Sequence, residues 1–200
     1  MKMKIILSLF DYTGNWSQPY RDAGYTVLQR DLQLGHDIFR DVELAMYDMA
    51  EGLKIHGLLA AVPCTDFATS GARWWKAKEA LPPPAHPLIQ CDNRLEYFTS
   101  MVLCVLVMVE LLKPAWWAIE NPVGRIQKLV PEIGPCRLWF QPCDFGDPYT
   151  KKTGLWGNFN SNLVKTPVLP LFGSEMHKTT NAKRSITPRG FARAFFNANP

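Results

Sequence analysis

Two side chains in this sequence are candidates for nucleophilic and acid–base chemistry, because each directly follows an apolar run. Cys64 lies two residues after the run 57–62, and Glu120 comes directly after 115–119. A cysteine is partly ionised near neutral pH and is intrinsically nucleophilic. A carboxyl group can hold or pass a proton in the same site. A third polar cluster, residues 11–14, follows the first apolar run of the chain.

The elements between these clusters alternate in type. Apolar runs predict buried strands over residues 4–10, 25–28, 57–62 and 115–119. Apolar residues at helical spacing predict helices over about 17–23, 39–53 and 94–112. Asn93 or Asp92 can cap the last of these helices, and Pro114 stops it.

Strands that alternate with helices predict an α/β fold with a doubly wound, mostly parallel sheet. A chain of 200 residues suits one domain spanning residues 1–200. In such a sheet, ligands bind at the carboxyl ends of the strands. We therefore expect Cys64, Glu120 and residues 11–14 to meet at one rim of the sheet.

Two stretches do not fit the alternation. Residues 68–92 have the composition of a long loop, which in a compact domain is usually functional or mobile. Residues 131–185 are rich in proline, glycine and short apolar pieces, and they are expected to be irregular.

Composition narrows the class of protein only modestly. The net charge of +4 permits contact with nucleic acid without requiring it. An odd number of cysteines and no secretory signal favour a reduced, cytoplasmic protein. The longest apolar run, 101–109, is about half a membrane span, so a buried helix is expected. Cys136 and Cys143 are spaced too widely, with His177 distant, to predict a metal site.

Four motifs, in order along the chain, resemble those of the cytosine-5 DNA methyltransferase family. They are Leu7-Ser-Leu-Phe-Asp-Tyr-Thr-Gly14, Pro63-Cys-Thr-Asp-Phe-Ala-Thr-Ser-Gly-Ala-Arg73, Ile119-Glu-Asn-Pro-Val-Gly124 and Ile186-Thr-Pro-Arg-Gly-Phe-Ala-Arg193. The family carries Pro-Cys after its fourth strand and Glu-Asn-Val after its fifth. The resemblance implies a Rossmann-like methyltransferase fold, S-adenosylmethionine as cofactor, and methylation of carbon 5 of cytosine in DNA.

The resemblance also implies which residues bind the cofactor. Residues 10–14 would cradle the methionine moiety, Asp31 would accept hydrogen bonds from the ribose, and Asp37 with Ile38 would contact the adenine. Asp31 and Asp37 are also typical turn or cap residues. The full set implied for the cofactor is Phe10, Asp11, Tyr12, Thr13, Gly14, Asp31, Asp37, Ile38 and Pro63.

By the same resemblance, Cys64 and Glu120 are the catalytic residues of a covalent mechanism. The thiolate would add to carbon 6 of cytosine, and a protonated Glu120 would meet N3, helped by apolar neighbours among Trp116, Trp117 and Pro122. Taken alone, the cysteine would more often be a buried packing residue. The candidate substrate-binding residues are Asn121, Arg73, Trp74, Trp75, Arg125 and Lys151. Trp74 and Trp75 could equally serve loop packing.

The chain departs from the family pattern in ways that leave the substrate open. Tyr12 replaces a usual glycine, Pro122 replaces valine, and residues 149–156 occupy the place of a Gln-x-Arg-x-Arg strand. The segment 131–185 stands where the family has a target-recognition domain. Alternatives are therefore methylation of a free cytosine nucleotide or a single strand, and a catalytically silent nucleic-acid or cofactor-binding module. Five basic residues form either a solvated face or a phosphate site: Lys178, Lys183, Arg184, Arg189 and Arg193.

Overall fold

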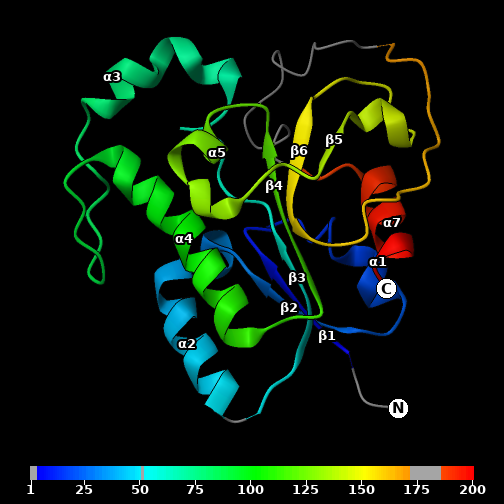
Figure 1. The fold of residues 1–200 in the computed structure, drawn as a ribbon, viewed down its shortest axis with the longest axis horizontal. Helices are drawn as coiled ribbons and strands as arrows, with labels where there is room; N and C mark the ends of the chain where they lie inside the picture. The colour runs from blue at the N-terminus through cyan, green and yellow to red at the C-terminus, as the bar shows by residue number, and fades with distance from the viewer. Residues whose placement is uncertain (1–3, 51, 172–185) are drawn as a thin grey trace.

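The computed structural model describes residues 4–50, 52–171 and 186–200, which form helices around a six-stranded sheet (Figure 1). The strands are β1 (Ile5–Leu9), β2 (Thr26–Arg30), β3 (Ile55–Ala60), β4 (Trp116–Pro122), β5 (Leu138–Phe140) and β6 (Thr153–Asn158). Their order in the sheet is β2-β1-β3-β4-β6-β5. β1 to β4 pair in parallel, whereas β6 is antiparallel to both β4 and β5. One strand, β6, is therefore reversed in an otherwise parallel sheet.

Helices cover both faces of this sheet (Figure 1). The α-helices are α1 (Gln18–Asp22), α2 (Ile38–Ala50), α3 (Trp75–Glu79), α4 (Arg94–Leu112), α5 (Ile126–Leu129) and α7 (Arg189–Ala198). α2 and α4 contribute to the apolar core on one face, and α1 and α7 to the core on the other. The predicted fold class is confirmed: this is an α/β fold with a doubly wound, mostly parallel sheet of the Rossmann-like type.

The apolar run in β3 shows why the sheet lies at the centre. Leu58 and Leu59 are both 0% exposed, yet they belong to the two different cores. Successive side chains of a strand point to opposite faces, so a strand covered on both sides needs apolar residues at every position. The continuous run, rather than an alternating one, thus indicates a central strand.

α4 begins and ends where the sequence predicts. The side chain of Asn93 accepts a hydrogen bond from the backbone N–H of Glu96 at 2.9 Å, and the helix ends at Lys113, whose φ is +44°. By length and composition α4 is apolar enough to cross a membrane. Here one side of it packs against α2 and the sheet, where Val102 and Val105 are fully buried, whereas Leu103 and Val107 on the helix are exposed, so the expected buried helix is buried on one side.

Two expectations about irregular segments are wrong in part. Residues 69–79 form the 3₁₀ helix η2 (Thr69–Trp74) and α3, within the stretch expected to be a loop. Residues 138–158 supply β5, the 3₁₀ helix η4 (Pro142–Phe145) and β6. Pairing with β6 continues along β4 as far as Pro122, beyond the predicted end of that strand at residue 119. β5 has three residues, and β6 pairs with β4, which lies thirty or more residues away in sequence. Local pattern therefore does not reveal them.

Several sequence-based expectations fall outside the described residues. These are His177, Lys178, Lys183 and Arg184, which lie within residues 172–185. Within the described ranges, no group of three or more His, Cys, Asp or Glu side chains is placed to hold a metal ion.

Candidate functional site

The loop after β3, which carries Cys64, is hydrogen-bonded to the last residues of β4, which include Glu120, and to the loop that follows them. The Asn121 side-chain amide donates to the Val62 carbonyl at 3.0 Å. Beyond it, both the N–H and the hydroxyl of Thr69 donate to the Val123 carbonyl at 2.9 Å. Cys64 lies between Val62 and Thr69, and Glu120 directly precedes Asn121. The predicted convergence of these two loops at one rim is therefore present.

Gly124 allows the closest approach between the two loops. A Cβ atom built on Gly124 would lie 1.9 Å from the carbonyl oxygen of Phe67, far inside van der Waals contact. That same carbonyl accepts the N–H of Arg125 at 2.9 Å. Only a residue without a side chain fits this crossing.

Replacing Gly124 by alanine is therefore expected to lower the free energy of unfolding by about 1–3 kcal/mol, because the loops must separate. Urea unfolding followed by circular dichroism measures this. Gly71→Ala is the matched control in the same region, since a Cβ there meets its nearest atom at 3.6 Å. Equal stability of the two variants would show that the crossing does not matter.

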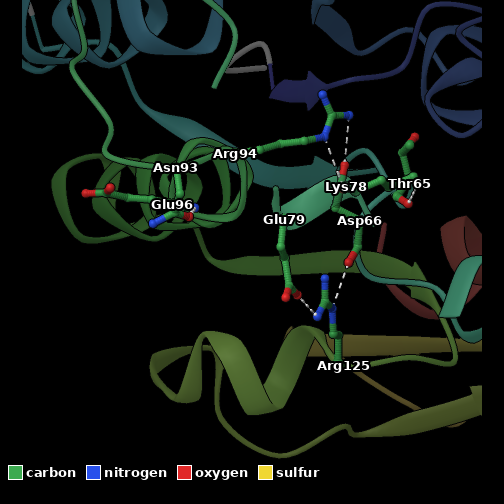
Figure 2. Close-up of polar contacts among 8 residues, drawn as sticks. All are labelled: Thr65, Asp66, Lys78, Glu79, Asn93, Arg94, Glu96 and Arg125. Carbon is green, nitrogen blue, oxygen red and sulfur yellow. Dashed lines mark hydrogen bonds and ion pairs between the residues drawn. The ribbon is translucent and has the colours of Figure 1, made fainter. Parts of the chain in front are cut away.

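The turn that carries Cys64 is held from both sides through Asp66 (Figure 2). The Cys64 carbonyl accepts the N–H groups of Phe67 and Ala68 at 3.0 and 2.9 Å. Asp66 is 2% exposed, and Arg94 of α4 donates to its two carboxylate oxygens at 3.3 and 3.2 Å. Arg125 donates through Nε to the Asp66 carbonyl at 2.9 Å. Two arginines from different elements thus fix the backbone two residues after the sulfur.

Asp66→Asn should cost about 1.5–3 kcal/mol of stability, because the charge-assisted bonds to Arg94 are weakened in a buried position. It should also change the rate at which iodoacetamide alkylates Cys64. Chemical unfolding and mass spectrometry of the alkylated peptide measure the two effects. Asp92→Asn, at an exposed position, is the control. Parent-like values for both quantities would rule out this positioning role for Asp66.

α3 lies against the same turn. The Lys78 ammonium donates to the Thr65 carbonyl at 2.5 Å, and Glu79 forms an ion pair with Arg125 (Figure 2). The Arg125 guanidinium carbon also lies 4.2 Å from the centroid of the Trp75 ring. Trp75 therefore packs within the protein beneath a cation.

Trp74 differs from its neighbour in exposure. Its side chain is 53% exposed, and the Arg73 guanidinium carbon lies 5.2 Å from its ring centroid. The sequence did not distinguish the two tryptophans. The structure assigns Trp75 a packing contact and leaves the Trp74 ring accessible.

Glu120 is buried beside a cation. It is 7% exposed, and the Lys151 ammonium lies 3.6 Å from its Oε1 atom. Burial, with the nearby charges of Asp147 and Glu120, raises the pKa of Tyr149 to about 12. Trp116 was expected to contribute to an apolar environment around Glu120. Trp116 is, however, the first residue of β4, and its ring stacks on Tyr20 of α1. A strand rises about 3.3 Å per residue, so this ring lies too far along β4 to surround the carboxyl group.

Asn121 has one partner and one unsatisfied atom. The residue is 0% exposed, its Nδ2 donates to Val62, and its Oδ1 is buried with no hydrogen-bond donor among the described residues. A buried acceptor without a donor costs about 1–3 kcal/mol. This oxygen is therefore a candidate acceptor for a ligand N–H group.

The loop after β1 has an unusual backbone. Phe10 has φ +56° and Gly14 has φ +70°. A non-glycine residue in the left-handed region is costly, and such positions often occur at functional sites. Asp11 is buried, and its Oδ2 accepts the hydroxyls of Ser8 and Ser17, each at 2.9 Å. The Asp11 side chain thus holds the loop in shape from inside.

Gln29 of β2 supports the same loop from outside. Its Nε2 donates to the carbonyls of Asp11 and Tyr12, the latter at 3.0 Å. Tyr12 and Thr13 remain exposed. Gln29 was not among the predicted site residues, although its position near the end of β2, beside the β1 loop in a parallel pair, points to this loop.

Asp31 and Asp37 both act as caps. Asp31 Oδ1 accepts the N–H of Gln33 at 2.9 Å and so caps the 3₁₀ helix η1 (Leu32–Leu34). Asp37 Oδ1 accepts the N–H of Phe39 at 3.1 Å, next to the buried Ile38, and its Oδ2 contacts His86 Nε2. His86 comes from the long segment before α4 and was not expected here. A cofactor role for either aspartate stays a prediction.

A small pocket lies elsewhere, between α2, α4 and the sheet. Its lining is mostly apolar, with Arg30 and Asp41 among its residues. Burial raises the pKa of Asp41 above its ordinary value. Neither Cys64 nor Glu120 lines this pocket, so we do not assign it to the candidate site.

Comparison with known proteins gives similarity at the level of solved structures alone. No family model and no curated protein matches the chain. One similar structure is described as a DNA modification methyltransferase encoded within a prophage (E. coli), with 14% identity and a TM-score of 0.48 over 78% of this chain and 46% of that one. Another is a methyltransferase of Entamoeba histolytica, with 10% identity and a TM-score of 0.43 over 84% and 58%. The chain thus matches about half the length of these structures.

Proposed function

We propose that this chain is an S-adenosylmethionine-dependent methyltransferase that methylates carbon 5 of cytosine in DNA through a covalent cysteine adduct. The observation that carries the proposal is the hydrogen-bonded pair of loops at the carboxyl ends of β3 and β4. One loop contributes Cys64 and the other follows Glu120. Together with the motif resemblance, this pairing supports a nucleophile and a proton-handling group acting on the same ring.

The reaction needs a nucleophile because carbon 5 of cytosine is too poor a nucleophile by itself. The Cys64 thiolate adds to carbon 6, and the ring electrons move toward N3 and the exocyclic oxygen. Glu120 supplies the proton or the strong hydrogen bond at N3. After carbon 5 has gained the methyl group, loss of its proton and β-elimination of the thiolate restore the aromatic ring.

The Glu120–Lys151 pair suits the edge of a cytosine that has left its stack. That edge presents an amino donor, the N3 acceptor and the O2 acceptor. A carboxyl oxygen can accept from the amino group, and the Lys151 ammonium can donate to O2. The unsatisfied Oδ1 of Asn121 lies on the opposite face of β4 from Glu120 and is a separate acceptor near the end of the strand. This arrangement supports a pyrimidine with an amino group.

The residues at the ends of β1 and β2 suit the cofactor in part. The bend between Phe10 and Gly14 brings main chain to the rim, and Asp31 offers a carboxylate at the end of β2. Asp37 contacts Phe39 N–H and His86 within the protein, one through each oxygen, so an adenine amino group would share an oxygen with one of them. When bound, S-adenosylmethionine supplies an electrophilic methyl group.

The alternatives differ in substrate or in activity. A free cytosine nucleotide or a single strand would use the same chemistry at Cys64. A catalytically silent module would need neither Cys64 nor Glu120, and the retention of both argues against it.

The test is to incubate the chain with methyl-labelled S-adenosylmethionine and, separately, duplex DNA, single-stranded DNA or cytosine nucleotides. Nucleoside mass spectrometry then identifies the methylated product. We expect 5-methylcytosine in at least one arm. Product in none of the arms, or a methyl group on a different atom, would contradict the proposal.

A further inference from the structure

We propose that this site acts on an unpaired strand of nucleic acid, with Trp74 and Trp139 as base-stacking surfaces on either side of it. The inference rests on the proposed function in one respect: it takes cytosine as the base that reacts with Cys64. It draws on a different part of the structure, namely two exposed tryptophans that each lie beside a cation.

The second tryptophan lies at the far side of the sheet. Trp139 of β5 is 41% exposed, and the Lys152 ammonium lies 5.3 Å from its ring centroid. The edge-to-face contact of Trp139 with the buried Trp156, at 5.7 Å between centroids, supports the ring from below. Trp74 with Arg73 shows the same combination, an accessible indole beside a cation.

A continuous set of hydrogen-bonded loops links the two tryptophans. η2, which ends at Trp74, starts at Thr69, whose N–H donates to Val123. Val123 in turn donates to the Lys152 carbonyl at 3.0 Å. In Figure 1, α3 and the β5–β6 pair lie on opposite sides of the upper end of β4. α3, which directly follows Trp74, and β5, which carries Trp139, therefore lie on opposite sides of the strand that carries Glu120.

The charges along these loops suit a phosphate backbone. Glu120 and Glu79 each pair with a cation, Lys151 and Arg125 respectively. Within the described part of the chain, neither Arg73 nor Lys152 has a carboxylate partner. These two cations therefore remain available to phosphates.

Stacking surfaces discriminate between paired and unpaired bases. Indole rings beside cations are how single-strand binding proteins bind bases, because every unpaired base has an accessible face. In a duplex those faces are covered by neighbouring bases. Two such rings, on elements on either side of β4, therefore favour a single strand over a duplex.

Fluorescence anisotropy tests this with the Cys64→Ser chain and no cofactor. The probes are labelled oligonucleotides of about fifteen nucleotides, a length that one such groove can cover, as single-stranded DNA, single-stranded RNA and duplex DNA. We expect tighter binding to a single strand than to the duplex, weakened by salt. Trp74→Ala and Trp139→Ala should each weaken it by about 5- to 150-fold. The two single-strand arms decide between DNA and RNA.

Tyr47→Ala on α2 is the matched control, because Tyr47 is 71% exposed and lies on a helix outside these loops. Lys152→Glu removes the cation beside Trp139 without truncating a packed ring, so it keeps the test valid if Trp139→Ala unfolds. It should weaken single-strand binding as well. Duplex preference, or single-strand binding unchanged in Trp74→Ala and Lys152→Glu, would overturn the inference.

The outcomes separate this inference from the proposed function. Single-strand binding that depends on both tryptophans, without methyl transfer by the parent chain, would refute the proposed function and keep this one. Methyl transfer to duplex DNA without single-strand preference would do the reverse.

Discussion

Replacing Cys64 by serine is expected to abolish methyl transfer, with a loss of at least about 10³-fold in kcat. A hydroxyl group is almost fully protonated at neutral pH and cannot add to carbon 6 as a thiolate does. The turn should survive, because the substitution leaves the Cys64 main-chain carbonyl, which accepts from Phe67 and Ala68, in place. Stability should therefore stay within about 0.5 kcal/mol of the parent.

Transfer of labelled methyl groups to cytosine-containing DNA measures the first effect, and urea unfolding measures the second. Cys143→Ser is the control, since Cys143 lies in η4 rather than in the Cys64 turn. Both variants keep the same number of thiols. Substantial activity in Cys64→Ser, or equal losses in the two variants, would exclude Cys64 as the nucleophile.

Replacing Glu120 by glutamine should reduce kcat by about 10²- to 10⁴-fold, the usual size of a general acid–base contribution. Glutamine has nearly the same shape, but it cannot donate a carboxyl proton to N3. It also removes the partner of Lys151, whose ammonium lies 3.6 Å from Glu120. Steady-state kinetics across a range of pH should show that kcat of the glutamine variant depends on one ionising group fewer than kcat of the parent.

Glu132→Gln, at an exposed position in the 3₁₀ helix η3 (Pro131–Ile133), is the control for this change. Lys151→Met separates the contribution of the cation from that of the carboxyl group. If Glu120→Gln kept the parent's kcat and pH profile, proton handling would have to be assigned to another group.

Much of the fold could be predicted because its signals are local. The continuous apolar run at Leu58 and Leu59 indicates a strand buried on both faces, and the structure confirms it. Asn93 before an apolar helix predicts the start of α4, and its side chain caps Glu96 as expected. These features depend on residues within one turn or one strand of each other.

The missing part of the fold depends on long-range pairing. β6 pairs with β4 across more than thirty residues of chain, and β5 pairs in turn with β6. Gly154 of β6 shows the constraint: a Cβ atom there would lie 2.7 Å from the Trp156 ring and 2.9 Å from the Trp139 ring. A glycine in a short segment looks like a turn signal in the sequence, whereas here it makes room for two indoles.

The sequence predicts which loops form the site, but it does not predict which side chains contact each other there. The convergence of the Cys64 and Glu120 loops follows from two neighbouring parallel strands. The Lys151 ammonium, by contrast, reaches Glu120 because β6 runs antiparallel to β4. His86 reaches Asp37 from the segment before α4. Contacts of this kind depend on the assembled fold.

Covalent trapping tests the central claim most directly. The chain is incubated with S-adenosylmethionine and an oligonucleotide carrying 5-fluorocytosine, whose fluorine cannot leave as a proton, so elimination of the thiolate is blocked. We predict a stable protein–oligonucleotide complex, with the attached pyrimidine mapped by mass spectrometry to Cys64. Methylation of the matching cytosine oligonucleotide without any trapped complex, or a complex mapped to a different cysteine, would contradict the account.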